Sequence, residues 1–169
     1  YRYIKAGYRL DATETSITEL WLYNSKIRDV SGLVNILPQT KITGLRFDTT
    51  PISDISCIVD VLPKTMICRL MLDEIQITDI SGLAKVLPQT YITELGLSHN
   101  QITDFSDLIQ VLPKTYIKKI GLGGNNITDV SGLAKVLPHT NINYLALCRN
   151  QITDVSGLAE CLPQTYIQK

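Results

Sequence analysis

The fold is decided by a unit that reads I-T-E-L-G-L-S-H-N-Q-I-T-D-F-S-D-L over residues 92–108 and I-N-Y-L-A-L-C-R-N-Q-I-T-D-V-S-G-L over residues 142–158. The pattern recurs every 25 residues without insertion or deletion, and successive copies open at Ile17, Ile42, Ile67, Ile92, Ile117, Ile142 and Ile167. Self-similarity at a fixed period of about 20–50 residues is typical of solenoids, in which identical units stack along one axis. The sequence therefore predicts six complete repeats over residues 17–166.

The first half of each repeat predicts a strand. Counting from the opening Ile as position one, apolar residues follow at positions four and six, as at Leu95 and Leu97. This alternation is typical of a short, half-buried strand. A further Ile occupies position eleven in every copy, and Asn occupies position nine in the last three.

The second half of each repeat predicts a short helix. Leu83, Val86 and Leu87 have the i, i+3, i+4 spacing of one helix face, and Pro stands at position twenty-two of every copy. We expect the Ser at position fifteen to cap the helix and the Pro to end it after about two turns. The Asp at position thirteen forms a row that calcium could bind, but its place before every Ser favours a role at the helix start.

The repeat pattern resembles the L-x-x-L-x-L-x-x-N-x-L signature of leucine-rich repeats. The motif N-Q-I-T-D-V-S-G-L is similar to the repeats of bacterial internalins, and S-G-L-A-K-V-L-P resembles a shortened ribonuclease-inhibitor-type unit. The resemblance implies an α/β solenoid shaped as a curved horseshoe, with parallel strands on the concave face and short helices on the convex face. It also implies a ladder of Asn side chains, which we expect to fail in the first three repeats, where Ser25, Thr50 and Ile75 occupy position nine.

The two ends depart from the repeat. Residues 6–15 align loosely with the helix half of a repeat and carry more charge, which predicts a degenerate N-terminal cap over residues 1–16. Residues 167–169 match the start of a seventh repeat, so we expect the chain to be a fragment of a longer protein.

Composition narrows the class of function. Lys and Arg number 16, as do Asp and Glu, and they are interspersed, so we predict no binding of nucleic acid or membrane. No signal peptide is visible, and the four scattered cysteines suit free thiols in a reducing compartment. His99 and Cys148 lie two strands apart, too far for a nucleophile pair, and no ligand spacing fits a metal. We therefore expect a non-enzymatic protein without cofactor or metal.

The columns that vary between copies indicate where a partner binds. The first three repeats carry large and charged side chains at positions five, seven and eight, whereas the fourth to sixth repeats carry small residues, glycines among them, at positions five and seven. Trp, Tyr and Arg dominate binding energy at protein interfaces. The predicted contact residues are Trp21, Tyr23, Arg46, Asp48, Arg69, Met71, Asp73 and Glu74. An alternative is that Trp21 packs against the N-terminal cap, and the glycines are then either a clearance for the partner or idle.

These observations predict a protein–protein interaction module whose partner contacts the concave face of the first three repeats. The internalin-like wording indicates, by analogy, an effector of a pathogen that acts inside the cell, in the host cytosol; a eukaryotic cytosolic adaptor is the alternative. Two other functions fit the sequence: a targeting or regulatory segment of a larger enzyme, and a passive spacer.

Overall fold

In the computed structural model, which describes residues 17–52 and 54–165, each repeat contributes one strand. Among these residues six strands form one parallel sheet in chain order, and each residue pairs with the residue 25 positions later. The strands are β1 (Glu19–Trp21), β2 (Gly44–Arg46), β3 (Arg69–Met71), β4 (Glu94–Gly96), β5 (Lys119–Gly121) and β6 (Tyr144–Ala146).

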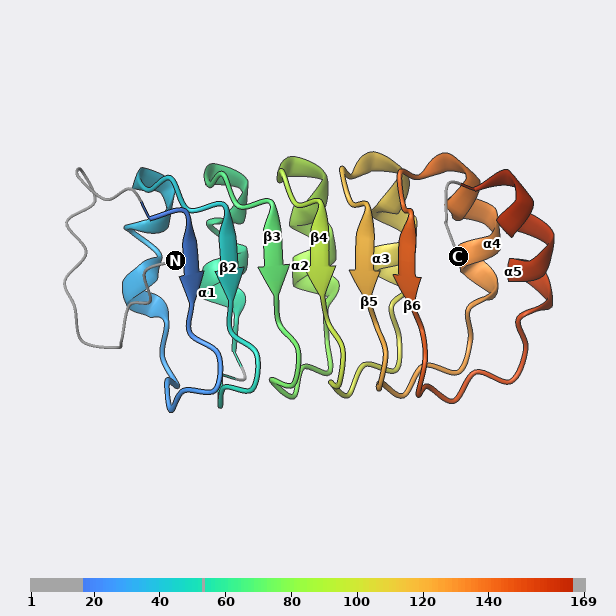
Figure 1. Cartoon of the computed structure of the whole chain (residues 1–169), viewed down its shortest axis with the longest axis horizontal. Coiled ribbons are helices and arrows are strands. Elements are labelled where there is room, and N and C mark those ends of the chain that lie inside the picture. The colour runs from blue at the N-terminus through green and yellow to red at the C-terminus, as the bar shows by residue number, and fades with distance from the viewer. Residues whose placement is uncertain (1–16, 53, 166–169) are drawn as a thin grey trace.

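Short helices follow the strands on the other face of the molecule (Figure 1). The α-helices are α1 (Ser56–Val59), α2 (Ser81–Val86), α3 (Ser106–Val111), α4 (Ser131–Val136) and α5 (Ser156–Cys161). The 3-10 turns are η1 (Ser31–Leu33), η2 (Leu37–Gln39), η3 (Leu62–Lys64), η4 (Leu87–Gln89), η5 (Leu112–Lys114), η6 (Leu137–His139) and η7 (Leu162–Gln164). The predicted α/β solenoid is therefore confirmed. The predicted cap at 1–16 and the predicted seventh repeat at 167–169 lie outside the described residues.

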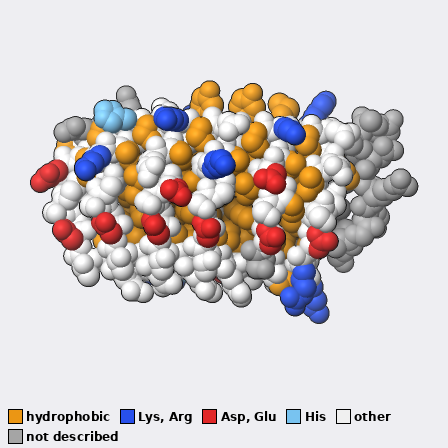
Figure 2. All heavy atoms as spheres, turned by 180° about the vertical axis from the view of Figure 1, so that it is seen from behind, with side chains coloured by type: hydrophobic (Ala, Val, Ile, Leu, Met, Phe, Trp, Pro, Cys, Tyr) orange, Lys and Arg blue, Asp and Glu red, His pale blue; other side chains and the backbone are white. Residues whose placement is uncertain are grey.

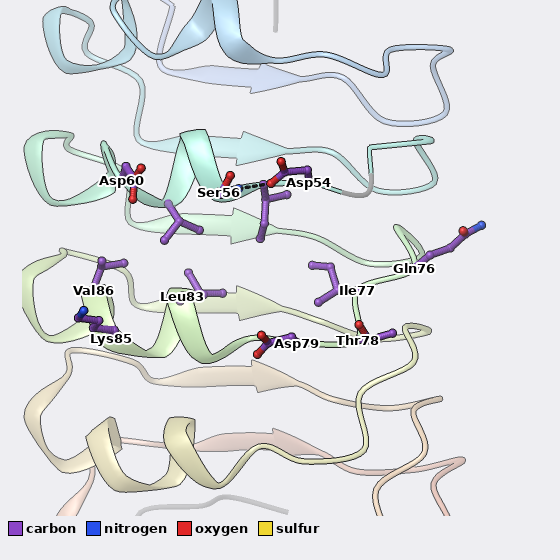
Figure 3. Close-up of a pocket in the computed structure, with 13 residues that line it drawn as sticks. Asp54, Ser56, Asp60, Gln76, Ile77, Thr78, Asp79, Leu83, Lys85 and Val86 are labelled. Atoms are coloured by element: carbon purple, nitrogen blue, oxygen red, sulfur yellow. Dashed lines mark hydrogen bonds between the residues drawn. The ribbon is translucent and has the colours of Figure 1, made fainter.

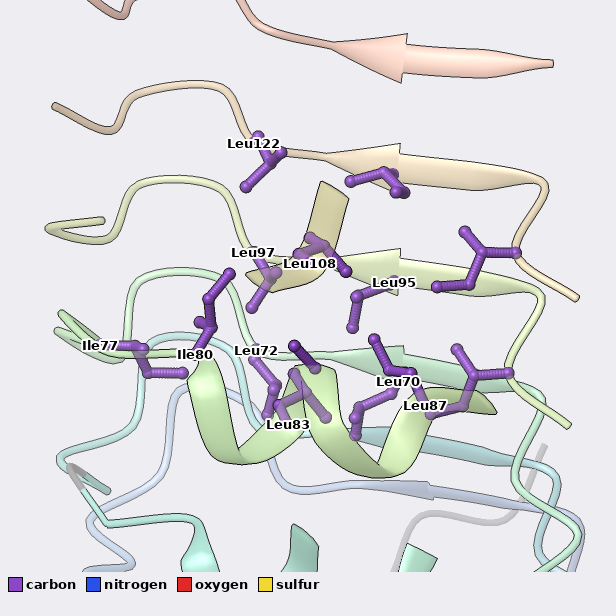
Figure 4. Close-up of a cluster of buried hydrophobic side chains, with 14 of the residues drawn as sticks. Leu70, Leu72, Ile77, Ile80, Leu83, Leu87, Leu95, Leu97, Leu108 and Leu122 are labelled. Carbon is purple, nitrogen blue, oxygen red and sulfur yellow. The ribbon is translucent and has the colours of Figure 1, made fainter. Parts of the chain in front are cut away.

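The core is a continuous apolar layer between the sheet and the helices (Figure 4). Leu95 at the centre of β4, and Leu97 just beyond it, are at most 1% exposed, and Leu83 of α2 and Leu108 of α3 face them from the helix layer. Because no single repeat encloses its own apolar side chains, each repeat needs its neighbours to be stable.

The start and end of each helix differ from the prediction. No Ser side chain makes a capping bond in the described helices; instead the Asp at position thirteen accepts the backbone N–H of that Ser at 2.8 Å in all six repeats. The expected role of the Ser hydroxyl was therefore wrong, and that of the Asp is confirmed. Pro does not end the helical segment either. It is the second residue of a 3-10 turn, where its fixed φ fits and its missing N–H costs nothing.

The Asn at position nine joins consecutive repeats, as the sequence predicts. The amide of Asn125 donates to the carbonyls of Leu97 at 2.9 Å and Leu122 at 3.0 Å, and its oxygen accepts the N–H of Ile102 at 3.0 Å. Asn100 and Asn150 make equivalent bonds. The earlier repeats lack these bonds: Thr50 bonds only within its own repeat, and the hydroxyl of Ser25 is buried without a partner among the described residues.

Position eight is a turn residue with left-handed backbone rather than part of a strand. Its φ is positive in every repeat, from 50° at Asn24 to 69° at Gly124, and includes 55° at Thr49. A β-branched residue rarely adopts this conformation. The column that the sequence suggested as a variable strand face is therefore a variable turn, whose side chains stand at the edge of the sheet.

Replacing Asn125 with Ala tests the side-chain ladder. The change removes three hydrogen bonds. It leaves the buried N–H of Ile102 without a partner, whereas the carbonyls of Leu97 and Leu122 keep their bonds from the neighbouring Asn side chains. We therefore expect the free energy of unfolding to fall by about 2–3 kcal/mol. Urea titration followed by circular dichroism measures it. Asn126→Ala is the matched control, because this neighbouring side chain is exposed and its loss changes stability by less than about 0.5 kcal/mol. Equal losses in the two variants would contradict the structural role of the ladder.

The helix-start aspartates predict loss of stability in acid. The backbone N–H and the hydroxyl of Ser131 both bond the carboxylate of Asp129 and hold its pKa below the ordinary value of 3.8; Ser156 does the same for Asp154. An acid whose pKa is lower in the folded state stabilises the fold above its unfolded pKa, and this stabilisation disappears as the pH falls through the folded pKa.

We therefore expect the melting midpoint to be nearly constant above about pH 5 and to fall below about pH 4. Thermal unfolding measured across this range tests the prediction. An Asp129→Asn variant keeps an oxygen acceptor without the titrating charge, so its melting midpoint should fall less steeply. A midpoint that rises on acidification would refute the assignment.

Candidate partner-binding surface

The predicted contact residues lie on the open face of the sheet, which we call the strand face. Positions three and five of each strand point outward, because position four points into the core. Of the eight predicted residues, Tyr23, Arg69 and Glu74 are exposed, Trp21, Arg46, Met71 and Asp73 are half-buried, and Asp48 is buried. Strand and turn geometry brings them together across the first three repeats.

Trp21, Tyr23 and Arg46 form one cluster. The rings of Trp21 and Tyr23 are tilted by 59° with their centroids 6.3 Å apart. The guanidinium carbon of Arg46 lies 5.2 Å from the centroid of the Tyr23 ring, within the range of a cation–π contact. The Nε of Trp21 donates to Glu19 at 3.2 Å, and Arg46 forms an ion pair with Asp48. Each member of the cluster is thus oriented by a neighbour before any partner arrives.

Asp48 and Asp73 hold repeats together instead of standing free at the surface. Asp48 is only 5% exposed, and it accepts the backbone N–H of Asp73 at 3.2 Å. Asp73 in turn accepts the backbone N–H of Ser98 at 2.5 Å. These carboxylates connect successive repeats in the part of the array that has no Asn at position nine. Asp48 can therefore reach a partner only indirectly, through the position it gives to Arg46.

The environment of Asp73 favours its neutral form. Burial raises the pKa of this carboxyl above its ordinary value, and the charge of Asp48 adds to the effect. The hydrogen bond from Ser98, together with Arg46 and His99, opposes it. Because the shift has the opposite sign to that of the helix-start aspartates, the titration of Asp73 opposes theirs in its effect on stability.

Position three carries a row of ion pairs across the strand face that the sequence analysis did not include beyond Arg69. Arg69 bonds Glu19 on one side at 3.0 Å and Glu94 on the other at 3.2 Å, and Lys119 lies 3.8 Å from Glu94. Glu19 reaches Arg69 by lying over Gly44, where an added Cβ would lie 1.7 Å from its carboxylate. The alternating charges of this column were visible in the sequence and could have revealed the row.

Most glycines of the strand face are covered by side chains from the preceding repeat, whereas the side chain nearest to Gly123 is Cys148 of the following repeat. A Cβ on Gly96 would come within 2.7 Å of the sulfur of Met71 and 2.9 Å of a carboxylate oxygen of Asp73. A Cβ on Gly124 would lie 2.6 Å from the Nδ1 of His99. The glycines therefore leave space that side chains of neighbouring repeats occupy.

The helix face has a shallow hollow between α1 and α2 (Figure 3). Asp54 and Asp79 line it, but each carboxylate already accepts a backbone N–H at the start of a helix. Within the described part of the chain, no group of three or more His, Cys, Asp or Glu side chains could hold a metal ion. Nor is any helix there long and apolar enough to cross a membrane.

Known proteins of solved structure share this arrangement of repeats. No protein-family model matches the sequence, and neither does any curated protein. Among solved structures, internalin C2 from Listeria monocytogenes is 28% identical with a TM-score of 0.61, and the match covers 89% of this chain and 70% of internalin C2. A second L. monocytogenes internalin, inlF, is 21% identical with a TM-score of 0.63, and the match covers 93% of this chain and 48% of inlF.

A plant protein shares the fold at lower identity. The leucine-rich-repeat ectodomain of the Arabidopsis thaliana membrane receptor kinase GASSHO1/SCHENGEN3, solved in complex with CASPARIAN STRIP INTEGRITY FACTOR 2, is 15% identical with a TM-score of 0.59. The match covers 90% of this chain and 18% of that ectodomain. The chain is thus a leucine-rich-repeat protein whose units resemble those of internalins. It spans about half of inlF and less of the plant ectodomain, so the functions of those whole proteins are not carried over to it.

Replacing Asp48 with Ala distinguishes a framework role from a surface role. The change removes the acceptor of the Asp73 N–H and the ion-pair partner of Arg46, so we expect a loss of about 1–3 kcal/mol in the free energy of unfolding. Asp48→Asn keeps an acceptor oxygen and should lose less. Glu74→Ala is the control, because this side chain is exposed. If Asp48→Ala unfolds at the same urea concentration as the wild type, the carboxylate does not hold the repeats together.

Proposed function

We propose that this chain is a non-catalytic protein-binding module whose partner contacts the strand face of the first three repeats. Leucine-rich-repeat proteins generally act by binding other proteins, and the plant ectodomain was solved in complex with CASPARIAN STRIP INTEGRITY FACTOR 2. The observation that carries the proposal is the cluster of Trp21, Tyr23 and Arg46. A further part of the proposal, made by analogy with the internalin-like sequence of the repeats, is that the chain belongs to an effector acting inside host cells.

The cluster has the composition and order of an interface centre. Trp, Tyr and Arg are the residues most enriched among those that dominate binding energy. Tyr23 is 45% exposed, so its ring still presents apolar area to a partner. Because Glu19 and Asp48 already orient Trp21 and Arg46, the side chains lose little conformational entropy on binding. Around the cluster, the ion pairs of Arg69 supply a polar rim.

The double variant Trp21→Ala/Tyr23→Ala tests the proposal. We expect it to weaken binding to a protein captured by the wild-type chain by about 2–4 kcal/mol, because two anchors are lost from the centre of the interface. Capture from host-cell lysate identifies the protein, and isothermal titration calorimetry then measures both affinities. Arg46 is left in place, because its removal would strand the buried carboxylate of Asp48.

Tyr144→Ala is the matched control, because Tyr144 is 55% exposed on the same face but lies in the last strand. It should bind as the wild type does. Unchanged affinity in a folded Trp21/Tyr23 variant would place the contact elsewhere. Failure to capture any protein specifically would favour the spacer function instead.

A further inference from the structure

The formal net charge of zero conceals a separation of charge between one long edge of the solenoid and its helix face. We call the segments that lead from each Pro into the next strand the return edge; they are residues 38–43, 63–68, 88–93, 113–118 and 138–143. These segments contain Lys41, Lys64, Lys114 and Lys118 and no Asp or Glu. The six helix-start aspartates line the helix face away from this edge, and Figure 2 shows their row.

A row of exposed apolar side chains runs along the return edge. Met66, Tyr91 and Tyr116 occupy position twenty-five of consecutive repeats and are 60%, 62% and 59% exposed. Apolar side chains project along this upper edge in Figure 2, with basic side chains beside them. Neither tyrosine makes a hydrogen bond or ring contact with any described residue.

The fold does not need apolar residues in this column. Lys41 and Asn141 occupy the same position in other repeats and are equally accommodated as exposed residues. The neighbouring positions perform the structural work: the hydroxyl of Thr90 bonds the carbonyl of Leu87 at 2.8 Å, and Ile92 is 1% exposed in the core. The packing of the repeats therefore does not account for the three consecutive exposed apolar side chains. Such rows mark interaction sites.

We propose that the return edge binds a short, extended, acidic polypeptide segment that carries apolar side chains. Lysines lie on both sides of the apolar row. Lys64 comes two residues before Met66, and Lys114 comes two residues before Tyr116. Lys118 comes two residues after Tyr116. Carboxylates of a bound segment pair with these lysines, and its apolar side chains cover the tyrosines. Lys41 and Tyr116 are three repeats apart, which corresponds to about 14 Å at the spacing of neighbouring strands. About four extended residues of a bound segment span this length.

Charge and shape favour a peptide over the other anionic partners. Binding to an anionic membrane gains about 1 kcal/mol for each basic residue near the surface. Four lysines on a chain without net charge therefore give little long-range attraction to such a membrane. Nucleic acids are bound mainly through phosphates contacted by many basic groups, often with Arg, and the return edge has no Arg. A peptide needs only a few ion pairs beside an apolar contact. This surface is separate from the strand face, so the inference does not rest on the function proposed above.

A fluorescein-labelled copolymer of Glu and Tyr is the probe. We expect fluorescence anisotropy to show binding that weakens as salt is added, because exposed ion pairs are screened. The variants Tyr91→Ser/Tyr116→Ser and Lys64→Glu/Lys114→Glu should each weaken binding by about tenfold or more. All four side chains are exposed, so the variants should remain folded, and circular dichroism checks this.

Three controls make the result decisive. Tyr144→Ser and Lys135→Glu change an exposed Tyr and an exposed Lys elsewhere, and Trp21→Ala changes the strand face; all three should bind the copolymer as the wild type does. A copolymer of Lys and Tyr should not bind. Absence of binding to the Glu–Tyr copolymer, or binding unaffected by the return-edge variants, would overturn the proposal. So would binding only to vesicles of equal phosphatidylserine and phosphatidylcholine, which would assign the edge to membranes.

Discussion

Backbone hydrogen bonding between equivalent residues of successive repeats is the constraint on which the whole structure depends. The pairing of residue i with residue i+25 is the same at every step from β1 to β6. Backbone hydrogen bonds between repeats continue beyond the strands as far as position eight, where the N–H of Thr49 donates to the carbonyl of Asp73 at 3.0 Å. A single inserted residue would break the register for every later strand and reverse which side chains face the core. The unbroken period of the sequence is therefore a requirement of the sheet.

Two kinds of side chain support this backbone pairing in different parts of the array. In the later repeats the Asn at position nine bonds the neighbouring turns from inside the core, so the strand face above it is left to small residues. In the second and third repeats Asp48 and Asp73 make comparable connections from the strand face itself. Asp48 also forms the ion pair that orients Arg46 over Tyr23. Stability and the candidate binding cluster thus depend on shared residues at this end of the chain.

The sequence predicted most of the repeat architecture and fewer of the surface contacts. The repeat length, the strand and helix halves and the position-nine ladder follow from local patterns that recur in every copy, such as Leu95-x-Leu97 and Asn125. The pattern also shows which way a side chain leaves the backbone, but it does not show what then covers that side chain. That is why the burial of Asp48, the path of Glu19 over Gly44 and the packing of His99 over Gly124 were not foreseen. Nor did overall composition reveal that the lysines of the return edge are separated from the aspartates of the helix face.

The row of ion pairs on the strand face has a consequence for how such a chain can change in length. Frame contacts join each repeat only to the next, so loss or duplication of one 25-residue unit preserves the register of the sheet. Glu19 and Arg69, however, meet across an intervening repeat that contributes Gly44. Removing that unit would make the two side chains direct neighbours, whereas duplicating it would separate them beyond reach. Unequal exchange between repeats would thus conserve the fold while altering the arrangement of charges that a partner meets.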